Sequence, residues 1–141
     1  MLGRLRVVQG GDGAGGGKLL SETLAWELQW GSEYETLLEI ADKGAFYPEA
    51  LAKRPELPVE LRHWLEVFYF LNTDRPIGGM GGVGYIPFSS KARYCDEYGV
   101  TSVEDRDWFF RLIGRLDQTY MEYQAEKAES KSASEKQATS P

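Results

Sequence analysis

Apolar residues recur every three or four positions over several stretches of this chain, which is the spacing of one face of an α-helix. The sequence PVELRHWLEVFYFL at 58–71 holds one such repeat. A longer repeat covers residues 103–126, and its apolar positions are Phe109, Leu112, Ile113, Leu116, Tyr120 and Tyr123. We therefore predict a helix over each range, with the apolar face of each turned toward a common core.

Shorter repeats predict further helices at 19–30, 32–43, 48–53 and about 89–98. Gly44 and Gly99 follow predicted helix ends and suit the left-handed position after a helix. Candidate N-caps precede the predicted starts: Ser32, Ser89 or Ser90, and Thr101 or Ser102. We find no convincing strand, so the pattern predicts an all-α fold, a small irregular bundle of four to five helices.

Residues 72–88, NTDRPIGGMGGVGYIPF, interrupt this helical pattern. So many glycines do not suit a regular strand, and a loop of this length inside a compact domain is often functional. Two interpretations stay open. In one, the segment is a recognition loop in which Arg75 pairs with a partner's carboxylate and apolar side chains insert into the partner. In the other, it is a long hinge that wraps the domain's own surface.

The ends of the chain differ in composition from its middle. All 18 aromatic residues lie between Trp26 and Tyr123, and six of the 16 glycines fall within residues 10–17. Residues 127–141 contain no aromatic and no large aliphatic residue. Such segments have little apolar surface to bury. We therefore expect a flexible segment at 1–18, a helical domain at 19–126 and a disordered polar tail at 127–141.

The charge argues against two classes of partner. The formal net charge is −6, and residues 1–18 carry +2 of it, so the remainder carries −8. An acidic body does not suit binding that rests on phosphate neutralisation or on an anionic membrane surface. No apolar run approaches the ~18 residues that a membrane span needs. We expect neither a nucleic-acid nor a membrane partner.

The sequence offers little catalytic chemistry. Gly11-x-Gly13-x-x-Gly16 matches the dinucleotide-binding fingerprint in form, but a helix rather than a βαβ unit is expected after it. His63 and Cys95 are single residues of their type and lie in different predicted helices, which makes a poor nucleophile pair and a poor zinc site. We therefore expect no enzyme, catalytic residue, metal or cofactor.

One composite pattern runs from His63 to Tyr123. It joins a Trp-rich helix, Leu-x-x-x-Arg, Gly-x-Ile-Pro, a short aromatic helix ending in Tyr-Gly, and a helix closing on Leu-Asp-x-x-Tyr. The matching positions are Trp64, Phe68, Leu71, Arg75, Gly79, Gly81, Gly82, Gly84, Ile86, Pro87, Tyr94, Tyr98, Gly99, Leu116, Asp117 and Tyr120. This stretch resembles small proteins of tailed bacteriophages and prophages, which are similar to tail assembly chaperones encoded near the tape-measure gene.

The resemblance implies a non-enzymatic assembly factor in the host cytoplasm that binds the tape-measure protein or other tail proteins. The alternative is a minor structural tail or tail-completion component of the virion, and a homo-oligomer stays open. An adaptable, aromatic-rich helical surface suits a helical partner. The side chains expected to bind it are Trp64, Phe68, Arg75, Met80, Tyr85, Ile86 and Pro87.

Overall fold

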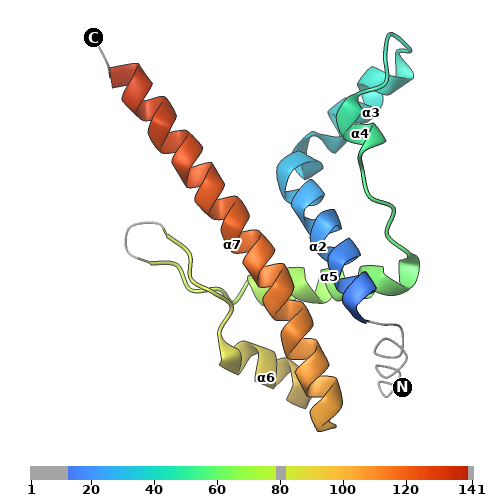
Figure 1. The fold of residues 1–141 in the computed structure, drawn as a ribbon, viewed down its shortest axis with the longest axis vertical. Helices are drawn as coiled ribbons and strands as arrows, with labels where there is room; N and C mark the ends of the chain where they lie inside the picture. The colour runs from blue at the N-terminus through green and yellow to red at the C-terminus, as the bar shows by residue number, and fades with distance from the viewer. Residues whose placement is uncertain (1–12, 79–81, 140–141) are drawn as a thin grey trace.

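The computed structural model describes residues 13–78 and 82–139, and it confirms the all-α prediction (Figure 1). Its elements are α2 (Gly13–Trp30), the 3-10 turn η2 (Gly31–Glu33), α3 (Tyr34–Asp42), the single turn α4 (Glu49–Ala52), α5 (Val59–Asn72), α6 (Phe88–Glu97) and α7 (Val103–Thr139). Within the described ranges there is no strand, and one isolated antiparallel bridge joins Ile77 to Val83.

The long helix α7 organises the molecule. Helix α2 packs against it, and α5 crosses and contacts both (Figure 1). Helix α6 lies beside the N-terminal part of α7, whereas α3 and α4 lie at the far end of α2. This arrangement leaves the C-terminal part of α7 projecting from the bundle.

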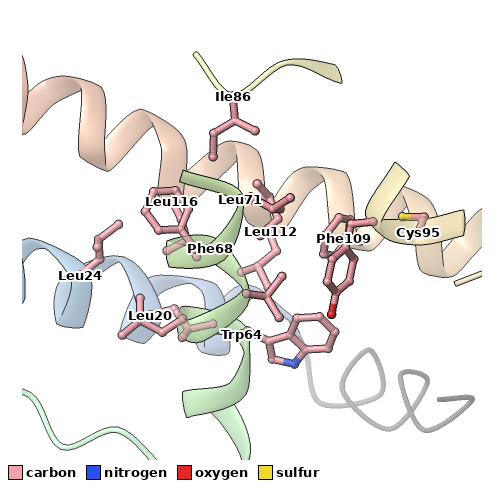
Figure 2. Close-up of a cluster of buried hydrophobic side chains, with 14 of the residues drawn as sticks. Leu20, Leu24, Trp64, Phe68, Leu71, Ile86, Cys95, Phe109, Leu112 and Leu116 are labelled. Carbon is pink, nitrogen blue, oxygen red and sulfur yellow. The ribbon is translucent and has the colours of Figure 1, made fainter. Parts of the chain in front are cut away.

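The main core forms where α2, α5 and α7 meet (Figure 2). The apolar faces predicted for 58–71 and 103–126 are confirmed as buried faces, because their central residues have almost no exposed surface. Side chains from the three helices meet there with Ile86 above them: Leu20, Leu24, Trp64, Phe68, Leu71, Phe109, Leu112 and Leu116.

The predicted helix ends are partly right. Gly44 and Gly99 have φ of 78° and 74°, which confirms the left-handed positions. Ser102 caps α7, since its Oγ accepts the backbone N–H of Asp105 at 3.0 Å. The Ser32 cap is wrong: Ser32 lies inside η2, and the residue before α3 makes no side-chain cap.

The predicted serine cap of α6 is also wrong. Helix α6 begins at Phe88, with Pro87 as its N-cap, so both serines lie inside the helix. Ser90 is buried, and its hydroxyl donates instead to the carboxylate of Asp74. The Ser90 side chain, which the local pattern predicts to cap the helix, instead makes a tertiary hydrogen bond.

The first helix begins at Gly13, earlier than the predicted Leu19. A Cβ on Gly17 would lie 3.1 Å from Nη1 of Arg115, and one on Gly16 would lie 3.6 Å from a methyl carbon of Leu61. A Cβ on Gly17 would thus be tight against the Arg115 side chain, and one on Gly16 would make an ordinary contact. Both residues lie in α2 against neighbouring helices, a packing role that the flexible-segment expectation for 1–18 did not include. Residues 1–12 of that segment lie outside the described residues.

The last helix runs through Thr139 and so continues past Glu126, where we expected a disordered tail to begin. The added stretch is rich in Ala, Glu, Lys and Gln, which have high helix propensity, and it has no glycine or proline before Pro141. The side chains of residues 127–137 are all exposed. This extension therefore adds helix without adding core.

Candidate functional site

The two described stretches of the glycine-rich segment, 73–78 and 82–87, run side by side between α5 and α6 as a narrow arm that projects from the bundle (Figure 1). Its base closes where the backbone N–H of Gly84 donates to the carbonyl of Pro76 at 3.0 Å, and the bridge between Ile77 and Val83 follows. Tyr85, which follows Gly84 at this base, is 56% exposed.

Arg75 holds the base of this arm. Its side chain is 3% exposed, and its Nη1 lies 2.6 Å from Oδ1 of Asp117 on α7. Nη1 also donates to the carbonyl of Gly84, and Nε donates to Oδ1 of Asn72, each at 2.8 Å. The guanidinium carbon lies 4.1 Å from the ring centroid of Tyr120, which is a cation–π contact.

Asp117 also connects the base of the arm to the residues that follow it. Its Oδ2 accepts the backbone N–H of Ile86 at 2.9 Å. We call Arg75, Gly84, Ile86, Asp117 and Tyr120 the latch. All five belong to the pattern that carries the phage resemblance, so the fold brings together pattern residues that are up to 45 positions apart.

The latch is a structural device with incomplete hydrogen bonding. The contact at Oδ1 of Asp117 is an ion pair without hydrogen-bond alignment, and the buried Nη2 of Arg75 has no acceptor among the described residues. Burying two charges costs desolvation, which their attraction and the extra contacts offset. Replacing either Arg75 or Asp117 by an uncharged residue would leave the other charge buried without its partner.

Most side chains expected to bind a partner lie inside the molecule. Trp64 and Phe68 are buried core residues of α5, and Ile86 is buried against the same core. Arg75 is held in the latch. In this conformation these four side chains hold the fold and present no surface to a partner.

The other three expected residues differ. Tyr85 is exposed, and its hydroxyl lies 3.5 Å from Oε1 of Gln118. Pro87 is half-buried at the start of α6. Met80 lies outside the described residues. Of the described members of the set, Tyr85 has the largest surface available for a contact.

A second, smaller cluster lies at the far end of α2. Trp26, Leu37 and Leu51 form its buried centre, and Trp30 packs against them. The indole N–H of Trp26 donates to the carbonyl of Ala50 at 2.9 Å, which fixes α4 to α2. The cluster is too small to fill the space between the three helices.

That space is a groove of about 820 Å³ between α2, α3 and α4, which we call the α2–α4 groove. Phe46, on the loop after α3, lines it and is 64% exposed. The groove was not predicted, although Phe46 and Tyr47 are adjacent aromatics outside any helical repeat, which is a signal for exposed apolar surface. Its apolar lining is Ala25, Trp26, Trp30, Leu37, Ile40, Phe46, Pro48, Ala50 and Pro55.

The opposite side of Trp26 is more polar. Oε2 of Glu27 lies 2.6 Å from Nη1 of Arg62, and its Oε1 accepts the hydroxyl of Tyr69 at 2.8 Å. Burial, followed by this hydrogen bond, raises the pKa of Tyr69 well above its ordinary value. The guanidinium of Arg54 lies over the ring of Trp26 at 5.5 Å. These polar groups join α2 to α5 and to the segment after α4.

The residues considered for chemistry have structural contacts of their own. Cys95 is fully buried, and burial raises the pKa of its thiol, so the reactive thiolate is disfavoured. His63 is on the exposed side of α5, against the ring of Trp64. Asp96 lies 2.6 Å from Arg106 in an ion pair. In the part of the chain that the structure describes, no three His, Cys, Asp or Glu residues are grouped as metal ligands.

The same described residues include no helix that is both long enough and apolar enough to cross a bilayer.

Comparison with known families identifies the pattern. The family model described as phage tail assembly chaperone matches residues 40–122, which is more than half of the 141 residues. The chain belongs to the phage tail assembly chaperone family. No curated protein and no solved structure matches it significantly. The match includes the latch, the arm and one side of the α2–α4 groove, and family membership implies a non-enzymatic role in tail assembly.

Proposed function

We propose that this tail assembly chaperone binds a helical segment of its phage's tape-measure protein in the host cytoplasm, before the tail tube polymerises. Membership of the family supports a tail assembly role. The tape-measure protein is the partner that the resemblance implies. A long helical chain exposes apolar faces until it is packed, so a chaperone that covers one of them prevents aggregation.

The observation that carries the proposal is the α2–α4 groove. It is an open apolar surface of the kind that an amphipathic helix occupies, and Phe46 projects from its edge. The groove lies outside the main core, so occupying it does not require the fold to open. The partner-binding role expected for Tyr85 remains part of the proposal, as a peripheral contact on the arm.

The test is co-expression of the full chain with the tape-measure protein of the same phage, followed by pull-down and a solubility assay. We expect the two proteins to co-purify and the soluble fraction of the tape-measure protein to rise. Phe46→Ser should reduce co-purification. Phe88→Ser is the matched control, since Phe88 is 67% exposed but lies on α6, far from the groove in the fold.

If neither solubility nor co-purification changes with the wild-type chain, the proposal is wrong. Mass spectrometry of purified virions then tests the alternative, a minor structural tail component. Abundant copies of this chain in the mature particle favour a minor structural tail component, and absence favours a factor that leaves before completion.

A further inference from the structure

The α2–α4 groove lies in the most acidic part of the chain. Residues 19–56 contain eight Asp or Glu residues and three Lys or Arg residues, a net of −5, whereas the whole chain carries −6. Of the −8 carried by residues 19–141, −5 therefore belongs to the segment that builds the groove. Glu22 and Glu49 line it directly. Glu33, Glu35 and Glu39 are exposed on η2 and α3 in the same segment, but they do not line the groove.

The basic residues of this segment cancel its negative charge only in part. Lys53 lines the groove, where its Nζ lies 2.9 Å from Oε1 of Glu49 and offsets that carboxylate. Arg54 faces the other side of Trp26, where its guanidinium lies over the rings of Trp26 and Tyr34. Lys43 is exposed at the end of α3. The groove thus has an apolar floor and an acidic rim, in which Glu22, Glu49 and Lys53 give the lining a net charge of −1 within a segment of net −5.

A second recess is smaller. A pocket of about 390 Å³ between the end of α5 and α6 is lined by Phe70, Tyr98 and three charged residues, Asp74, Arg93 and Glu97. Its Arg93 and Glu97 pair with each other at 2.8 Å. The net charge of this lining is −1, the same as that of the groove lining, so the two recesses differ in volume and in the charge of the surrounding segment.

We propose that the α2–α4 groove takes an amphipathic helix whose apolar stripe is flanked by Lys and Arg. This inference rests on the proposed function and specifies the chemistry of the tape-measure segment bound there. The apolar stripe fills the floor between Trp30, Ile40 and Phe46. The flanking cations face the acidic rim, which speeds encounter and rejects acidic helices through like-charge repulsion.

The first experiment uses the full chain and two synthetic helical peptides, one of Leu and Lys and one of Leu and Glu, with Leu at the same helical spacing in both. Fluorescence anisotropy should detect binding of the Lys peptide, and the Glu peptide should bind at least about tenfold more weakly. Raising the salt concentration should weaken binding of the Lys peptide. Equal binding of both peptides, or preference for the Glu peptide, overturns the inference.

Matched charge variants locate the site. Glu22→Lys changes the groove, and Glu126→Lys makes the same change in charge on the exposed part of α7. We expect Glu22→Lys to weaken binding of the Lys peptide by about fivefold or more, and Glu126→Lys to change it less than about twofold. Phe46→Ser should also weaken it, and Phe88→Ser should not. Equal effects from the paired variants overturn the assignment to this groove.

Pull-down with the tape-measure protein separates the two proposals. If the wild-type chain retains the tape-measure protein and Glu22→Lys retains it equally well, the charge inference fails while the proposed function stands. If the wild-type chain does not retain it, the proposed function fails as well. Loss on Glu22→Lys, with retention by Glu126→Lys, supports both.

Discussion

Two faces of α2 pack in different ways. Leu20 and Leu24 lie in the main core against α5 and α7, where the side chains have almost no exposed surface, and Leu28 continues that face. Trp26 and Trp30 lie on another face of the same helix and pack in the small cluster with α3 and α4. The first face is covered by the chain itself, whereas the second leaves a groove of about 820 Å³.

The comparison shows where the polar and aromatic residues of the family pattern are used. Beside the main core, these residues contact one another: Arg75 and Asp117 form an ion pair, and the ring of Tyr120 covers the guanidinium. At the other end, apolar surface is left open beneath an acidic rim. The latch residues of the family pattern therefore hold the fold, and the surface that we propose for a partner lies elsewhere, between α2, α3 and α4. Four predictions test this division, from the largest expected effect to the smallest.

Arg75→Ala should lower the free energy of unfolding by about 3–5 kcal/mol, because it leaves Asp117 buried without its partner. Urea unfolding followed by tryptophan fluorescence measures this. Arg111→Ala is the matched control, since its ion pair with Asp107 is exposed to solvent and should contribute little to stability. A loss for Arg75→Ala as small as the control would mean that Arg75 does not brace the fold.

Leu116→Ala and Leu37→Ala compare the two clusters directly. Leu116 is fully buried in the main core, so its truncation should cost about 3–5 kcal/mol and destabilise the whole chain. Leu37 belongs to the smaller cluster, and its truncation should cost about 2 kcal/mol and act locally. Hydrogen exchange should then speed up in α3 and α4 while the central turns of α5 and α7 stay protected. Uniform loss of protection in both variants would show that the clusters unfold as one unit.

The helices and the main core were predictable because a repeat of three to four residues is a local property. The same pattern also held a clue to the latch. Asp117 lies four residues after Ile113, on the apolar stripe of α7, and an acid there implies a buried partner. The identity of that partner was not predictable, because Arg75 lies 42 positions away and the arm between them has no regular pattern.

The groove and the full lengths of α2 and α7 could not be predicted from the local sequence pattern. The groove exists because α3 and α4 fold back beside α2, which no local repeat encodes. Gly16 and Gly17 look like flexible linker until their contact with Leu61 and Arg115 is known. Composition alone does not fix the end of α7, since polar helix formers suit both an exposed helix and a tail.

Ser102→Ala should cost about 1 kcal/mol, because the Ser102 hydroxyl caps α7, which supplies one side of the main core. Ser32→Ala is its control at the groove end, since the residue before α3 makes no side-chain cap. That change should stay within about 0.5 kcal/mol. Both changes in the free energy of unfolding are measured from urea midpoints, provided that the dependence of that free energy on urea is unchanged. A larger cost for Ser32→Ala would mean that the groove end depends on a cap after all.

Tyr69→Phe probes the seam between the two regions, where the Tyr69 hydroxyl donates to Glu27. Burial raises the pKa of Tyr69 above its unfolded value of 10, so the folded state favours the protonated phenol. The stability that this provides is complete below pH 10 and is lost as the pH rises above that value.

The variant should therefore be less stable than wild type near about pH 8, and the gap should narrow by about pH 11. Urea midpoints at the two pH values measure that gap. Tyr85→Phe, which removes an exposed phenol from the arm, is the control for general alkaline effects. A gap that stays constant or widens for Tyr69→Phe would mean that the hydroxyl does not join α5 to α2. The groove end would then be held to the main core by apolar packing and by Arg62 alone.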